Sequence, residues 1–220
     1  MQSAHDVGTA SMNAIVRVPT SGDSRAAGVK RLSAKLFVRD GIAVDQSHFI
    51  PVFHRWIRQG ALDQLLIDVA DYRHVHHGPG VMLIAHEGHY AMDEEAGQAG
   101  LLFQQTRWEG SDPQDRLRSL LCATLAACRR LEHDLSDRIR FRTDEILVRV
   151  ADRLAAPDTA ETFAQWRRIA SALLEPVFDT RVLRIRHEPG EAALTMRLLL
   201  GGELGIDQII DRLCLPDPLA

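Results

Sequence analysis

Short apolar segments with a period of two recur through the first half of the chain and predict strands. These segments span residues 32–38 (LSAKLFV), 65–72 (LLIDVADY), 81–92 and 100–108. Between the first two, residues 47–60 place their apolar side chains on one helical face and end in glycine, which is typical of a helix. The first half therefore predicts a strand, a helix and then a run of strands.

The second half follows a similar pattern after a long helix. Residues 111–134 carry an apolar stripe at helical spacing, with Asp112 as a cap candidate and Pro113 at the first helical position. Asp158 and Glu161 resemble a capping box that opens another long helix. The remaining segments are one or two strands over 138–150, a hairpin over 182–188 and 192–200, and a short helix over 206–213.

This order of elements predicts an α+β fold with a mixed or mainly antiparallel sheet. Two βαββ-like halves, read as a pseudo-repeat, are joined by a long amphipathic helix; coincidence is the alternative, because residue identity between the halves is low. The predicted organisation is one compact body. Its parts are a flexible leader (1–28), an N-terminal βαβββ unit (29–110), a connecting helix (111–136) and a C-terminal βαββ unit with a short final helix (137–220).

Composition is that of an ordinary soluble globular protein, with 45% apolar and 25% charged residues among 220. The net charge of -4 and the 5% aromatic content argue against nucleic-acid binding. No apolar run approaches the ~20 residues of a membrane span. The N-terminus lacks the pattern of a secretory signal, with Met12 as an alternative start. We therefore expect a cytoplasmic protein.

The three cysteines, Cys122, Cys128 and Cys214, form an odd set without paired spacing. Cys122 and Cys128 lie six residues apart on a predicted helix, about 240° around its axis, so they do not converge. We expect all three to be small buried residues in a reducing compartment.

Five of the ten histidines lie between His74 and Tyr90. Neutral imidazole is a common ligand of zinc and other divalent metals. His74 and His76 share a face if the strand continues. A metal site would then consist of His74 with His76 or His77 and one outside ligand such as His89. The alternative is a set of solvated turn histidines. In a hairpin, His86 would lie about 13 Å along the ladder from His74, too far for one ion.

Acid–base chemistry has three candidates: Asp68, Asp71 and His54. Asp68 lies among apolar residues, so it is expected to be buried, and a buried carboxylate needs a partner or a raised pKa. The competing interpretation is a structural ion pair or hydrogen-bonded aspartate.

Alternating arginines suggest a third kind of site. On a strand, Arg138, Arg140 and Arg142 would line one face and could hold an anionic cofactor or ligand such as a phosphate or carboxylate. A solvent-facing surface paired with acidic residues is the simpler interpretation.

No catalytic motif is recognisable. The sequence therefore favours a cytoplasmic binding or protein-interaction module that recognises a small ligand or a protein. The alternative is a divalent-metal or acid–base enzyme using the histidine-rich segment 74–89, with zinc as an example of the cofactor. A third possibility is a structural subunit that forms homo-oligomers.

Overall fold

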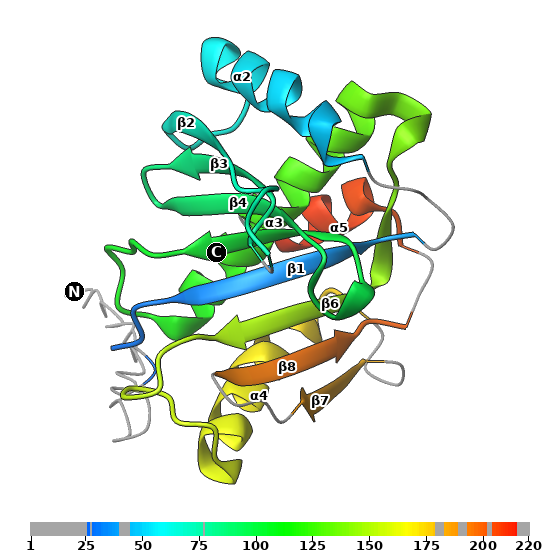
Figure 1. The fold of residues 1–220 in the computed structure, drawn as a ribbon. Coiled ribbons are helices and arrows are strands. Elements are labelled where there is room, and N and C mark those ends of the chain that lie inside the picture. The colour runs from blue at the N-terminus through cyan, green and yellow to red at the C-terminus, as the bar shows by residue number, and fades with distance from the viewer. Residues whose placement is uncertain are drawn as a thin grey trace, which may run out of the picture.

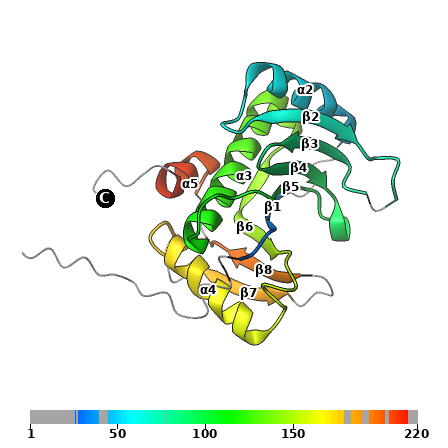
Figure 2. The same ribbon diagram turned by 90° about the vertical axis from the view of Figure 1, so that its left-hand side faces the viewer.

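The computed structural model describes Ala26 and residues 28–39, 45–76, 78–178, 183–188, 193–201 and 204–214. Within this part the fold is α+β, with one eight-stranded sheet in which every pair of neighbouring strands is antiparallel. The helices lie together on one side of this strongly twisted sheet (Figures 1 and 2). The predicted fold class and antiparallel sheet are confirmed. The predicted leader falls almost entirely outside the described residues.

The strands follow the sheet order β2-β3-β4-β5-β1-β6-β8-β7. Their bounds are β1 Leu32–Val38, β2 Leu66–Asp71, β3 Val81–Ala85, β4 Gly88–Asp93, β5 Gly100–Gln105, β6 Phe141–Val150, β7 Arg184–Glu188 and β8 Leu194–Leu199. β1 lies near the centre, because it pairs with β5 on one side and with β6 on the other. The strands that follow α2 therefore lie on one side of β1, and those that follow α3 lie on the other.

Four helices of the described part cover the sheet: α2 Phe49–Gln59, α3 Pro113–Leu135, α4 Ala160–Leu174 and α5 Ile206–Leu213. Local signals set several of their ends. Asp112 caps α3 by accepting the N–H of Gln114 at 2.8 Å, as predicted. Gly60 ends α2 in the left-handed conformation, with φ 56°. α4 differs from the prediction, because Thr159 rather than Asp158 is its N-cap and accepts the N–H of Thr162.

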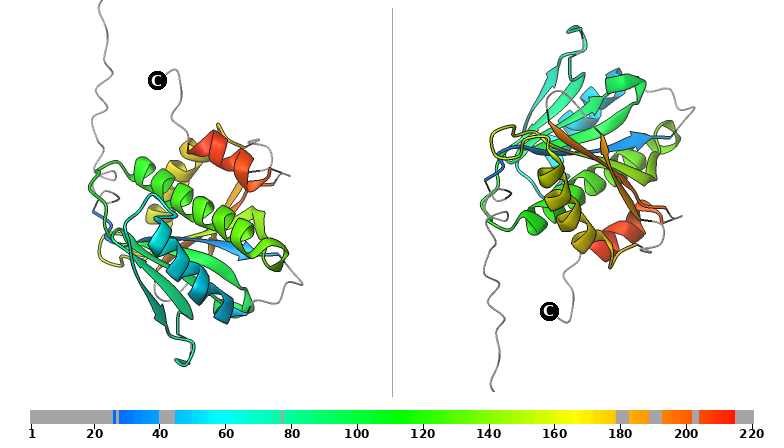
Figure 3. Two further views of the ribbon diagram at one scale, coloured as in Figure 1. Left: turned by 90° about the horizontal axis from the view of Figure 1, so that it is seen from above. Right: turned by 90° about the horizontal axis from the view of Figure 1, so that it is seen from below.

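A single apolar core fills the space between the sheet and the helices. Alternate residues of β1 (Leu32, Ala34 and Leu36) contribute to it and are fully buried. Trp56 of α2 and Trp166 of α4 are its largest side chains, and both are fully buried. The view from above in Figure 3 shows α3 running across the sheet between α2 and the C-terminal helices.

The prediction of one strand over 81–92 is wrong. The chain reverses at His86 and Glu87, so β3 and β4 form a hairpin and four strands follow α2. The buried positions shift by one residue at the reversal, from Val81, Leu83 and Ala85 to Gly88, Tyr90 and Met92. Gly88 allows the tight approach at this point, because a Cβ there would lie 2.0 Å from the carbonyl oxygen of Gln104.

The expectation that all cysteines are reduced is also wrong. Cys122 of α3 and Cys214 just after α5 form a disulfide with Cα atoms 5.6 Å apart, whereas Cys128 is free and buried. The sequence offered no signal, since the bonded residues are 92 positions apart and meet only because α5 packs on α3. No helix in the described ranges combines the length and apolar character needed to cross a membrane.

Candidate functional site

The face of the sheet opposite the helices is the candidate functional surface. β1 defines this open face, because Ser33, Lys35 and Phe37 alternate with its core residues. The strand register carries one row across the sheet from Lys35, listed in order as Ala70, Met82, Ala91, Leu102, Lys35, Leu147, Arg197 and Arg186. The row is apolar on the β2 to β5 side and largely charged on the β1 to β7 side.

Ion pairs fill the C-terminal half of the open face. Arg197 of β8 donates to Glu145 of β6 and to Glu188 of β7, the latter at 3.0 Å through Nη2. Arg142 donates to Glu145 from the same strand at 3.1 Å. Burial, together with the charge of Arg142, lowers the pKa of Arg197. Four charged side chains of this half are therefore already paired with one another: Arg142, Glu145, Glu188 and Arg197.

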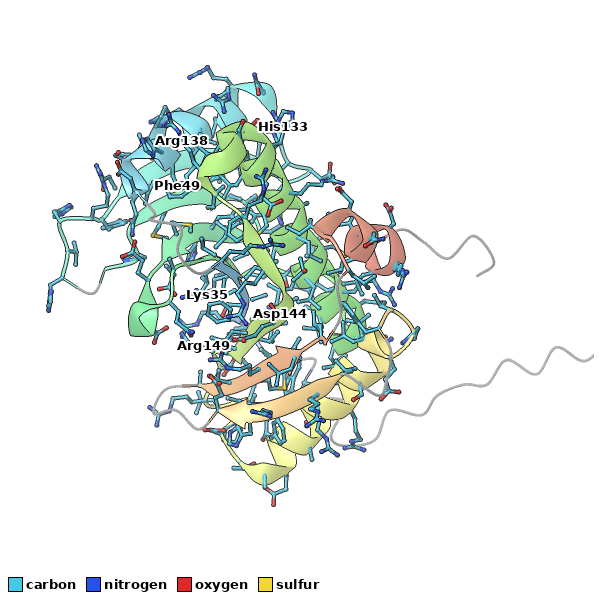
Figure 4. All side chains as sticks on the ribbon, turned by 90° about the vertical axis from the view of Figure 1, so that its right-hand side faces the viewer. Lys35, Phe49, His133, Arg138, Asp144 and Arg149 are labelled. Atoms are coloured by element: carbon cyan, nitrogen blue, oxygen red, sulfur yellow. A yellow bond between two sulfur atoms is a disulfide. The ribbon has the colours of Figure 1, made fainter. Side chains whose placement is uncertain are left out.

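Lys35 closes the centre of the open face. Its side chain is only 3% exposed and forms an ion pair with Asp93 of β4. The ring of Phe37 lies 5.4 Å from both Lys35 Nζ and the guanidinium carbon of Arg197. In Figure 4 Lys35 and Arg149 lie close together beside the strands, in agreement with the pairing of Arg149 with Ser33.

The N-terminal half of the open face is hollow. A cavity of about 1370 Å³ lies over His89, Ala91, Leu102 and Gln104, which form its floor. The loop between β2 and β3 forms one rim, and the loop between β4 and β5 forms another. We call this cavity the open-face groove.

Two polar side chains on the floor have no protein partner. His89 of β4 and Gln104 of β5 are opposite each other in the ladder, and both are half-buried. Neither side chain makes a hydrogen bond or ion pair with any described residue. Burial lowers the pKa of His89, so its ring is neutral near pH 7. A neutral imidazole offers one donor and one acceptor, and a primary amide offers both as well.

The rim of the groove carries charges of both signs, but its cations are already neutralised. Arg149 forms an ion pair with Glu95 at 2.9 Å, and Arg73 forms one with Asp71 at 2.7 Å. Two other carboxylates on the rim, Asp45 and Glu94, are hydrogen-bonded only to neutral groups.

Asp45 accepts the N–H of Ser47 at 2.9 Å, and Glu94 accepts the side-chain amide of Gln46 at 2.9 Å. Hydrogen bonds from Ser47 lower the pKa of Asp45, and His48 Nε2 lies 3.8 Å from its carboxylate. The uncompensated charge at the groove is therefore negative.

The predicted metal ligands are not brought together. His74 and His76 are exposed in the loop after β2, His89 lies on the groove floor, and His77 is outside the described residues. Among described residues, no group of three or more histidine, cysteine, aspartate or glutamate side chains is placed to hold a metal ion. β2 ends at Asp71, so His74 and His76 do not share the face of a strand.

The predicted acid–base residues are also separate. Asp68 is exposed rather than buried, and its carboxylate accepts the N–H of Val69 at 2.8 Å on the edge strand β2. Asp71 binds Arg73, and these hydrogen bonds lower the pKa of Asp71 to about 2. His54 is exposed on α2, and no hydrogen bond or ion pair joins the three among described residues. Asp68 and Asp71 instead cover polar main-chain groups at an open strand edge.

The predicted arginine stripe does not form. β6 begins only at Phe141, so Arg138 lies in a 3-10 helix near His48 and Arg140 donates to main-chain carbonyls, including that of Ser136 at 2.6 Å. Arg142 is paired with Asp144 and Glu145. Figure 4 shows Arg138 beside Phe49, well away from Asp144. Strand alternation therefore cannot align the three guanidinium groups.

A buried carboxylate that the sequence did not single out joins α2 to α3. Asp134 accepts Trp56 Nε1 at 2.6 Å and Arg130 Nε at 3.1 Å, with Arg55 Nη2 at 3.3 Å and His133 Nδ1 at 2.9 Å. Burial raises its pKa, but the hydrogen bonds from these four residues outweigh burial and the net shift is downward. The available signal was the fully buried Trp56, whose indole N–H needs an acceptor. Because every contact is internal, we interpret this cluster as structural.

The sequence matches no protein-family model and no curated protein. The geometry of the site is therefore the only guide to function. The open-face groove combines an apolar floor, two hydrogen-bonding groups without protein partners and an uncompensated negative charge. Such a surface is suited to binding.

Proposed function

We propose that this chain is a protein-interaction module whose open-face groove binds an extended, positively charged segment of a partner protein. The observation that carries this proposal is that His89 and Gln104, on the floor of a cavity of about 1370 Å³, have no hydrogen-bond partner among the described residues. Both side chains are half-buried at the floor of the groove, so a ligand could replace water at two hydrogen-bonding groups that no side chain of the described residues occupies.

The size of the groove favours a peptide over a small molecule. Its volume of about 1370 Å³ exceeds the roughly 300–1,000 Å³ that is common for small-molecule sites. Its floor is the surface of adjacent strands, where Ala91 and Leu102 form a shallow apolar strip beside His89 and Gln104. An extended segment with alternating apolar and polar side chains could place its apolar side chains over Ala91 and Leu102 and its polar groups near His89 and Gln104.

Charge complementarity favours a basic segment. Asp45 and Glu94 are the rim carboxylates bound by neutral groups, whereas Arg73 and Arg149 already have acidic partners. Complementary charge mainly increases the association rate and the specificity, so binding should weaken with added salt.

We also infer that the pseudo-repeat applies to topology alone. Support comes from the strand that ends each half: β5 returns beside β1, and β8 returns beside β6. The N-terminal half has two more strands, β2 and β3, whose connecting loop forms a rim of the groove. This difference explains why only one half of the open face carries the proposed site.

The test is selection from a phage-displayed library of random peptides of about 12 residues, long enough to cross the groove when extended. Selected peptides should be basic, and their affinity is measured by fluorescence polarisation. Gln104→Trp fills the groove, whereas Arg186→Trp adds the same ring to the opposite half of the same face.

We expect Gln104→Trp to weaken binding at least about tenfold, or ~1.4 kcal/mol, while Arg186→Trp leaves it unchanged. Failure to enrich any peptide over the library background would overturn the proposal. Equal affinity of the wild type and Gln104→Trp would overturn it as well.

A further inference from the structure

The C-terminal helix α5 is attached to α3 by one covalent bond and by the packing of a single apolar face. Ile206, Ile209 and Leu213 are its buried side chains. Cys214 follows α5 directly and is bonded to Cys122 of α3, closing a loop with a sequence separation of 92. α5 therefore depends on this disulfide more than the longer helices depend on any single contact.

The polar contacts of α5 are weak. Arg129 and Asp207 lie 3.5 Å apart with side chains that are 51% and 76% exposed, so water and salt screen this ion pair. Arg118 donates to the carbonyl of Leu213 at 3.2 Å, and Arg212 donates to the carbonyl of Val177 at 3.3 Å. A helix of eight residues is also too short to be stable alone.

The three cysteines differ in access to solvent. Cys122 and Cys214 are only half-buried, so a thiolate can approach their sulfur atoms. Cys128, also on α3, is fully buried, and burial raises the pKa of its thiol. Thiol–disulfide exchange is therefore directed to the pair that holds α5, and Cys128 is a natural control.

We propose that Cys122 and Cys214 form a redox latch that holds α5 against α3 when oxidised and releases it when reduced. A dithiol reductant, as in thioredoxin-type proteins, attacks the bond through one thiolate and forms a mixed disulfide. Its second thiol resolves this intermediate. Two electrons pass to the pair, Cys122 and Cys214 each gain a proton, and the reductant leaves as a disulfide.

Release of α5 uncovers the apolar side chains of α5 and the part of α3 beneath them. The groove is on the other face of the sheet, so the latch acts independently of the proposed peptide site. The sequence leads us to expect a reducing compartment, where disulfides are rare and those that form are usually transient and redox-sensing.

The experiment measures hydrogen–deuterium exchange in the full-length protein by mass spectrometry, with and without dithiothreitol. We expect amide exchange in residues 206–214 to become at least about tenfold faster after reduction. Exchange in β4 and β5 should stay unchanged. The double variant Cys122→Ser/Cys214→Ser should exchange quickly under both conditions, and Cys128→Ala should behave like the wild type.

Thiol counting accompanies this measurement. Alkylation of the air-oxidised, denatured protein should leave one free cysteine per chain, and reduction should raise this to three. Three free cysteines under oxidising conditions would overturn the latch. Identical exchange of α5 in the oxidised and reduced proteins would overturn it equally, because the bond would then hold nothing in place.

Discussion

The two halves of the open face differ in how their polar side chains are paired. In the C-terminal half, Arg197, Glu145 and Glu188 neutralise one another over the sheet. In the N-terminal half, His89 and Gln104 lie on an apolar floor without partners. A face that carries polar groups can satisfy them internally or leave them for a ligand, and this protein does one on each side of β1. This difference is the reason why we propose the N-terminal half of the open face as the binding site.

The largest effect should come from breaking the paired half. Glu145→Ala removes the carboxylate that both Arg197 and Arg142 contact, leaving two partly buried cations without it. Removing one partner of a buried ion pair typically costs about 3–5 kcal/mol. Arg197 keeps Glu188 and Arg142 keeps Asp144, so we expect a loss at the lower end, about 3 kcal/mol in the free energy of unfolding. Urea titration measures it. Gln104→Ala is the matched control in the hollow half. A comparable loss of stability in this variant would contradict the conclusion that only the C-terminal half is stabilised by paired polar groups.

A smaller loss should follow from changing the boundary between the halves. Lys35→Met leaves the carboxylate of Asp93 without its ion pair, and we expect about 2 kcal/mol of destabilisation because Asp93 is partly exposed. The double variant Lys35→Met/Asp93→Asn should recover much of this stability, as measured by thermal unfolding. An unrecovered double variant would mean that packing, rather than charge, explains the burial of Lys35.

The pH dependence of stability should report the unsatisfied half. Burial lowers the folded-state pKa of His89 below the ordinary histidine value of about 6.5, so between these two pKa values the unfolded chain binds the proton more readily. The stability associated with neutral His89 is therefore fully present above pH 6.5 and falls as the pH drops toward the folded-state pKa. His89→Gln should remove this component in urea titrations from pH 5 to pH 8.

A basic peptide bound in the groove should lower the pKa of His89 further, because a nearby positive charge disfavours protonation of the ring. If binding leaves the titration of His89 unchanged, as followed by NMR, the peptide does not reach the floor. That result would separate rim binding from groove binding.

The smallest effect should come from the rim. Glu94→Gln keeps the shape of a side chain that is hydrogen-bonded to Gln46 but removes its charge. We expect a selected basic peptide to bind about threefold more weakly, since exposed charges contribute roughly 0.2–1 kcal/mol, with almost no change in stability. Glu109→Gln is a control in an exposed segment outside the groove lining. If both substitutions weaken binding equally, the effect comes from the net charge of the protein and not from the position of Glu94 on the rim.

Local signals in the sequence were enough to predict most elements. The strand predicted over 32–38 coincides with β1, the helix predicted over 206–213 coincides with α5, and the helix predicted over 111–134 differs from α3 by one or two residues at each end. These elements carry strong periodicity and end signals such as Asp112 and Pro113. The α+β class follows from their order.

The candidate sites were predicted less well, because each depended on a continuous strand that ended elsewhere. The arginine stripe required a strand from Arg138, but β6 begins at Phe141. The histidine pair required β2 to reach His76, but β2 ends at Asp71. His89 was singled out by composition, yet its place beside Gln104 depends on the hairpin between β3 and β4.

Local signals located most helices and strands, with the β3–β4 hairpin as the exception, since capping, turn chemistry and periodicity act within a few residues. Which distant polar groups meet depends on the tertiary structure. Glu145 and Arg197 lie 52 positions apart, and Cys122 and Cys214 lie 92 apart, so neither pairing leaves a local trace. The open-face groove depends on tertiary structure in the same way. The strand order brings the β2–β3 loop to the rim of the N-terminal half, whereas ion pairs between strands fill the C-terminal half.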